Sequence, residues 1–157
     1  MSRNRRFKDA KSKRDGTTFI PVPVAVLESA AYRGLPMRAK ALLLDMLQQY
    51  RGINNGDISA AFSNMKAFGW KSEATLFAAR RELEEAGLVF VTRMGARPNR
   101  PTLFGFTFYE LDEMSKLEVT RKSFPRGQWR MKDPIPPLVK GLCGASVTSN
   151  AAVAQLK

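Results

Sequence analysis

Hydrophobic side chains recur at helical spacing in three parts of the central chain. In residues 36–52 and 58–68 they follow one another at steps of three, four and seven. A third segment, 72–86, begins at Ser72, a good N-cap, and is followed by Gly87, which suits a left-handed cap. The pattern therefore predicts three helices, with inward positions at Ala39, Leu42, Leu43, Met46, Leu47, Tyr50, Ile58, Ala61, Phe62, Met65, Phe68, Leu76, Ala79, Leu83 and Ala86.

The pattern then changes from helical spacing to that of strands. The run "LVFVTR", residues 88–93, is rich in β-branched and aromatic side chains, and "TLFGFTFYE", residues 102–110, places Phe104, Phe106 and Phe108 at every second position. The intervening "MGARPNRP" contains Gly and Pro, which favour a turn. These residues predict a β-hairpin with a basic tip.

Two shorter segments complete the folded part. The stretch "IPVPVAVLESAAYRGL" begins with prolines that favour extended backbone, and it predicts a short helix over 24–32 that ends at Gly34. Between the first two main helices, "INNGD" has the composition of a turn, because Asn and Gly tolerate positive φ.

The order of these elements predicts an α+β, mainly α, fold. Specifically, we expect a winged helix-turn-helix, in which a three-helix core carries a β-hairpin wing, with basic flexible flanks. Residues 1–16 hold seven basic and two acidic side chains without apolar periodicity, which indicates a flexible arm. The folded domain is expected over 17–112. Residues 113–157 are expected to form a basic, Pro-containing tail, in which Trp129 either covers the domain or stacks on a base.

Composition and charge narrow the function. The formal net charge of +12 favours nucleic acid, an anionic membrane or an acidic partner. The chain has no histidine and one cysteine, so the usual catalytic nucleophile pairs and His/Cys zinc sites are excluded. The Glu82, Glu84 and Glu85 cluster lies among arginines and is more typical of a solvated helix face than of a metal site. We expect no enzyme activity, no cofactor and no metal.

No apolar run reaches the length of a membrane-spanning helix, and no apolar segment of a signal peptide follows the basic start. The expected location is therefore the cytoplasm, with association to the nucleoid when the protein is bound to DNA.

The third helix and the hairpin supply the candidate DNA contacts. A helix whose N-terminal end and outer face are exposed can enter the major groove of duplex DNA, while a hairpin reaches the neighbouring backbone. Small, hydroxylated and basic side chains suit close approach and contact to bases or phosphates. On the helix these candidates are Lys71, Ser72, Glu73, Thr75, Ala78 and Arg81. On the wing they are Arg93, Arg97, Asn99 and Arg100, and on the arm Arg3, Arg5 and Arg6.

Three segments carry a resemblance to a known family. They are "SAAYRGLPMRAKALLLDMLQQYRGINNGDISAAF", "WKSEATLFAARRELEEAGLVFVTR" and the basic wing that follows. From about residue 19 to 109 the chain resembles the winged helix-turn-helix proteins of phages, plasmids and other bacterial mobile elements, including the DNA-binding domains of replication initiators. The resemblance implies a recognition helix over 72–86 and a wing over 93–101. It also implies double-stranded DNA binding in replication initiation or transcription regulation.

One alternative function remains open, and so do the partners. Winged helices are also used as protein-interaction modules, and such a module can bind or inhibit host machinery. The C-terminal tail can bind a replication protein or a host protein. The sequence is consistent with a monomer or a homodimer.

Overall fold

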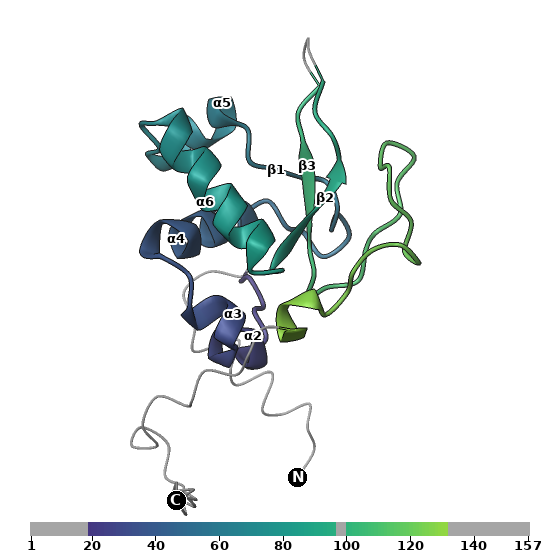
Figure 1. Cartoon of the computed structure of the whole chain (residues 1–157). Helices are drawn as coiled ribbons and strands as arrows, with labels where there is room; N and C mark the ends of the chain where they lie inside the picture. The colour runs from purple at the N-terminus through teal and green to yellow at the C-terminus, as the bar shows by residue number, and fades with distance from the viewer. Residues whose placement is uncertain (1–18, 97–99, 132–157) are drawn as a thin grey trace, which may run out of the picture.

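The computed structural model describes residues 19–96 and 100–131. Within these residues the fold is α+β, as predicted, with five α-helices and a three-stranded antiparallel sheet (Figure 1). In chain order the elements are α2 (Val24–Glu28), α3 (Ala30–Arg33), α4 (Met37–Leu47), β1 (Ile58–Ser59), α5 (Phe62–Met65), the 3-10 helix η1 (Lys66–Phe68), α6 (Glu73–Glu85), β2 (Val89–Arg93), β3 (Leu103–Phe106) and the 3-10 helix η2 (Gln128–Met131).

The prediction of a second helix over residues 58–68 is wrong for the first residues of that segment. Ile58 and Ser59 form β1, which pairs with β3 in the register Ile58 to Phe104, so the strand order is β1-β3-β2. The helix begins only at Phe62 and passes into η1 before Gly69. Ile58 is fully buried in the strand, and its spacing of four and seven residues to Phe62 and Met65 matches a helical repeat.

The short N-terminal helix is also divided. It consists of α2 and α3, separated at Ser29, whose backbone is extended. The Ser29 hydroxyl donates to the carbonyl of Val26 at 2.6 Å and accepts the N–H of Tyr32 at 3.2 Å. Ser29 thereby caps α3. The hydrophobic spacing continues across Ser29, so the sequence pattern does not indicate the break.

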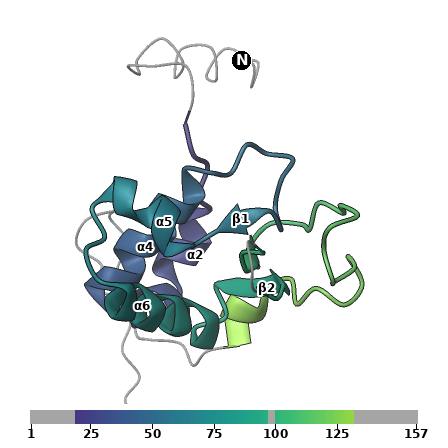
Figure 2. The same cartoon turned by 90° about the horizontal axis from the view of Figure 1, so that it is seen from above.

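Helices cover one face of the sheet. Residues 113–131, called the C-terminal segment below, lie on its other side (Figures 1 and 2). Phe104 and Phe106 are two residues apart on β3, so both side chains face the helices. They are buried with residues of α4 and α6. On the opposite face Phe90 meets Phe124 edge to face, with 5.9 Å between ring centroids. Gly105 is required there, because a Cβ would lie 3.0 Å from the Phe124 ring.

The folded part extends beyond the expected boundary at residue 112. Phe124 and Trp129 are each only 6% exposed, and Trp129 belongs to the main core cluster. Gly87, with φ of +70°, lies so close to Gln128 that a Cβ at residue 87 would be only 3.2 Å from the Gln128 backbone. Residues 113–131 therefore pack on the domain and are not a separate tail, since they complete the hydrophobic core.

The turn "INNGD" contains a buried structural residue. Asn55 is fully buried, its side-chain amide donates to the carbonyls of Phe106 and Glu110, and its side-chain oxygen accepts the N–H of Phe106 at 2.7 Å. Asn55 thus joins the turn to the end of β3. No helix in the described part of the chain is long and apolar enough to cross a membrane.

Candidate nucleic-acid interface

Helix α6 is held by contacts at both ends. Ser72 caps its start by accepting the N–H of Thr75 at 3.3 Å. Just before it, the indole N–H of Trp70 donates to the Asp45 carboxylate of α4 at 2.7 Å. Further along, Glu82 forms an ion pair with Arg38 of α4. These polar contacts flank the buried Leu76, Ala79 and Leu83 and fix which face of α6 is exposed.

The N-terminal part of α6 presents most of the predicted contact residues to solvent. Residues 71 to 75 are all exposed, and Ala78 is half-buried one turn further on. The Ser72 hydroxyl oxygen is used as a cap acceptor, but its hydrogen can still be donated to a phosphate or a base. Beside this surface lies a hollow of about 440 Å³, lined by Ala41, Asp45, Phe68, Gly69, Trp70, Lys71, Ser72 and Thr75.

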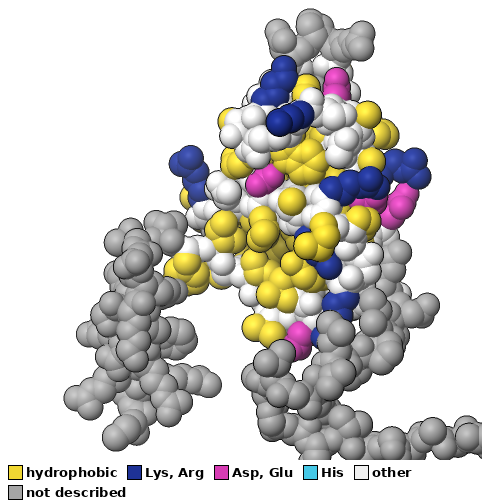
Figure 3. Space-filling view, turned by 90° about the vertical axis from the view of Figure 1, so that its left-hand side faces the viewer, with side chains coloured by type: hydrophobic (Ala, Val, Ile, Leu, Met, Phe, Trp, Pro, Cys, Tyr) yellow, Lys and Arg dark blue, Asp and Glu magenta, His cyan; other side chains and the backbone are white. Residues whose placement is uncertain are grey.

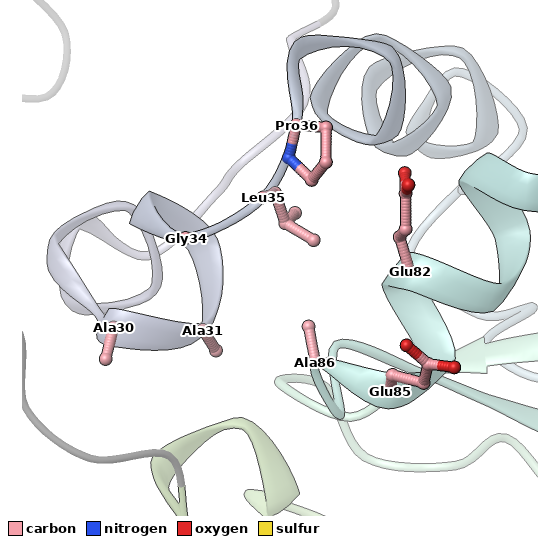
Figure 4. Close-up of a pocket in the computed structure, with 8 residues that line it drawn as sticks. All are labelled: Ala30, Ala31, Gly34, Leu35, Pro36, Glu82, Glu85 and Ala86. Atoms are coloured by element: carbon pink, nitrogen blue, oxygen red, sulfur yellow. The ribbon is translucent and has the colours of Figure 1, made fainter.

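The C-terminal half of α6 is acidic. Arg81, a predicted contact residue, forms an ion pair with Glu85 at 2.9 Å. A pocket of about 220 Å³ at this end is lined by Ala30, Ala31, Gly34, Leu35, Pro36, Glu82, Glu85 and Ala86 (Figure 4). Glu82 is paired with Arg38 and Glu85 with Arg81, so these two basic side chains are already engaged by carboxylates. The candidate contact surface of α6 is therefore its N-terminal half.

The α6 carboxyls differ in their surroundings. The hydrogen bond from Arg38 lowers the pKa of Glu82, and burial raises the pKa of Glu84. Glu82 is therefore held as a carboxylate, whereas the position of Glu84 opposes its ionisation.

A carboxylate from another segment of the chain contacts the hairpin. Arg93 donates to the carbonyl of Pro101 at 3.1 Å, which leaves its charge without a carboxylate partner in the described residues. Arg100, in contrast, pairs at 2.5 Å with Glu118, which lies 18 residues away in the C-terminal segment. The positive charge of the hairpin is therefore partly neutralised by a residue outside the hairpin.

Arg80 is a candidate contact that the sequence analysis missed. Its guanidinium carbon lies 5.2 Å from the centre of the Phe77 ring and 5.6 Å from that of Phe104, so the side chain bridges α6 and β3. Arg80 has no ion pair within the described residues, although its charge attracts the nearby Glu84 carboxyl, and its Nε is buried without a hydrogen-bond partner. The helical repeat places Arg80 beside the stripe of Leu76 and Ala79. The repeat does not show that the hairpin lies next to Arg80, because that contact is tertiary.

Four cations around α6 and the hairpin are without an ion pair in the described part of the chain: Lys66, Lys71, Arg80 and Arg93. They come from η1, the start of α6, its middle and the end of β2. The helical face of the molecule also has hydrophobic side chains across its middle, with Lys and Arg toward its upper part and edges (Figure 3). Phe77 and Leu44, exposed by 53% and 54%, are among the apolar side chains of α6 and α4.

Five predicted contact residues lie outside the described part of the chain: Arg3, Arg5, Arg6, Arg97 and Asn99. Within residues 19–96 and 100–131, no three His, Cys, Asp or Glu side chains are grouped so as to hold a metal ion.

Comparison with known proteins adds no assignment. No family model, curated protein or solved structure matches the chain. The candidate interface therefore depends on its own geometry and charge.

Proposed function

We propose that the chain is a winged helix-turn-helix protein that binds double-stranded DNA. The observation that carries the proposal is the exposed N-terminal half of α6 beside a hairpin, with Lys66, Lys71, Arg80 and Arg93 free of ion pairs among the described residues. In this assignment α4, α5 with η1, and α6 are the three core helices. The β2–β3 hairpin is the wing.

The proposed mode of binding follows from these exposures. The N-terminal half of α6 enters the major groove, where Thr75 and Ala78 approach base edges. Ser72, Lys71 and Lys66 of η1 contact the DNA backbone. Arg80 and Arg93 bind phosphates between the helix and the wing. Glu73 sits in the first turn of α6, where its charge interacts favourably with the helix dipole, and it can accept from a cytosine amino group. No cofactor or catalytic group takes part.

The biological role proposed is replication initiation or transcription regulation in a phage, plasmid or other mobile element. This part rests on the resemblance of residues 19–109 to such proteins. A replication or host protein is the proposed partner of the C-terminal region, and the protein acts as a monomer or a homodimer.

A second candidate function is a protein-interaction module that binds or inhibits host machinery. The exposure of Phe77 on α6 favours it, because aromatic side chains are enriched at protein interfaces. The two functions differ in their dependence on salt, since duplex binding releases counterions and weakens steeply as salt rises.

The test measures the affinity of the full chain for a labelled random-sequence duplex over a range of salt concentrations. Lys66 and Lys71 are exposed and carry no ion pair in the described part of the chain, so the test variant is K66Q/K71Q. We expect it to weaken binding and to reduce the slope of log affinity against log salt by about 1.8, or 0.9 for each phosphate contact.

The matched control is K122Q/R130Q, which removes two exposed basic charges that likewise have no ion pair among the described residues, one of them also lying over an aromatic ring. We expect its slope to stay close to that of the unmodified protein. No salt-dependent affinity in the unmodified protein, or equal losses in both double variants, would contradict the proposed interface.

A further inference from the structure

Glu118 places a carboxylate near the tip end of the hairpin, where it accepts from two hydrogen-bond donors. One carboxylate oxygen accepts from the Arg100 guanidinium at 2.5 Å, and the other accepts the backbone N–H of Met94 at 2.9 Å. The two donors lie on the two arms of the hairpin, which the bridge between Ala96 and Arg100 holds together. The carboxylate therefore occupies a site formed by a guanidinium and a backbone amide.

The position of Glu118 is fixed by its own backbone. Its N–H donates to the carbonyl of Thr92 at 2.8 Å, at the edge of β2. Two residues earlier Lys116 pairs with Asp57, and Leu117 lies against Gly56, so the loop is fastened to the body of the domain. The carboxylate is thus carried to the hairpin by a segment that does not depend on the Arg100 contact for its place.

The two donors suit a phosphate oxygen as well as a carboxylate. Guanidinium and backbone N–H groups are the usual protein contacts to the DNA backbone. Both partners of the pair are exposed, Arg100 by 48% and Glu118 by 45%, and exposed ion pairs contribute little free energy. A phosphate can therefore replace the Glu118 carboxylate at small cost.

We propose that Met94 N–H and Arg100 form a phosphate-binding site near the tip of the wing, and that Glu118 occupies this site in the free protein. The inference rests on the proposed DNA binding and specifies how it is controlled. Glu118 imitates a backbone phosphate, so the wing engages a duplex only when the carboxylate is displaced. The internal competitor lowers affinity for all duplexes alike, since it acts on a backbone contact and reads no base.

The experiment compares E118Q with a control that changes the net charge equally. Glutamine keeps the size of the side chain and can accept the Met94 N–H, but it lacks the charge that holds Arg100. The control is E28Q, because Glu28 is exposed on α2, at the end of the molecule remote from the hairpin (Figure 1). Both full-length variants are titrated with a random-sequence duplex at several salt concentrations, and thermal unfolding checks their folding.

We expect E118Q to bind about fivefold more tightly than the unmodified protein at low salt, the upper range for an exposed ion pair. Its salt slope should steepen by about 0.9, for one added phosphate contact, while E28Q changes neither quantity appreciably. In the E118Q background, R100Q should remove the gain. R100Q in the otherwise unmodified protein should weaken binding less than R100Q does in the E118Q background, because in the unmodified protein Glu118 already occupies the guanidinium.

Three results would overturn the inference. Equal effects of E118Q and E28Q would reduce it to net charge, and weaker binding by a folded E118Q would make Glu118 a support of the wing. A gain that persists in R100Q/E118Q would exclude Arg100 as the released group. Absence of any duplex affinity in the unmodified protein would instead overturn the proposed function itself, and the inference with it.

Discussion

The guanidinium of Arg80 lies over the ring of Phe104, with 5.6 Å between its central carbon and the ring centroid. This contact joins the middle of α6 to β3, so the Arg80 guanidinium lies where the helix meets the hairpin. A cation held against an aromatic face gains electrostatic attraction and loses little of its ability to bind an anion through its free N–H groups. We therefore regard Arg80 as the centre of the proposed interface.

Replacing Arg80 with glutamine should weaken binding to all duplexes and reduce the salt slope by about 0.9, because one phosphate contact is lost. The matched control is R130Q. Arg130 lies 4.8 Å from the Trp129 ring centroid in η2, which is remote from the hairpin tip. Each variant should lose up to about 1 kcal/mol of stability with its cation–π contact. A duplex affinity that falls equally in both would contradict the assignment.

Thr75 should influence which sequence is bound. Its side chain is exposed one turn into α6, and its own N–H is already satisfied by Ser72. We expect T75A to alter the motif recovered when the protein is selected on a random duplex library, with a preference change of about 1–3 kcal/mol at the contacted base pair. S63A on α5, also exposed, should recover the unaltered motif. An identical motif from T75A would exclude Thr75 as a base contact.

Asn55 should be essential for stability. Its removal in N55A leaves the N–H and carbonyl of Phe106 and the carbonyl of Glu110 without their present partners in a buried region. We expect a loss of about 3 kcal/mol in the free energy of unfolding by denaturant, since each such group costs about 1–3 kcal/mol. N64A, at an exposed asparagine of α5, should change stability by less than about 0.5 kcal/mol.

Acid should destabilise the contact between α4 and α6. The hydrogen bond from Arg38 lowers the pKa of Glu82, so the pair stabilises the folded state above the pKa of an unfolded glutamate. This contribution disappears as pH falls through the lower folded pKa. In E82Q, the melting temperature should be lower at neutral pH and should fall less on acidification than in the unmodified protein.

Glu84 provides the opposite sign at the same helix. Burial raises its pKa, so ionised Glu84 opposes folding above the raised pKa, and this penalty vanishes below the unfolded pKa. E84Q should therefore keep or raise the melting temperature at neutral pH. A similar neutral-pH loss in both variants would mean that the Arg38 contact is not the cause.

The sequence predicted the helices whose caps and apolar stripes are local. The Ser72 cap, the left-handed Gly87 and the buried Leu76, Ala79 and Leu83 are all confirmed. Ile58 was assigned to a helix because its burial arises from pairing with Phe104, 46 residues away, and no local pattern carries that information. The same reason explains the misplaced boundary at residue 112, since Trp129 is buried by residues distant in sequence.

The candidate site was predictable only in part. The exposed positions 71–75 follow from the helical repeat. The pairing of Arg81 with Glu85 is predictable from their spacing of four residues on one helix. The bonds of Glu118 to Arg100 and Met94 and the position of Arg80 over Phe104 depend on tertiary structure. The local charge pattern therefore overestimates the free positive charge of the hairpin, and it does not reveal the junction between α6 and the hairpin.

The most direct test of the central claim is photo-crosslinking of the full chain to a pool of random duplexes. A benzophenone amino acid replaces the exposed Ala74 near the start of α6, and in a second protein it replaces the exposed Glu28 on α2. The account predicts DNA crosslinks from residue 74 that fade as salt rises, and few from residue 28. Equal crosslinking from both positions, or none from residue 74, would contradict binding of duplex DNA by α6.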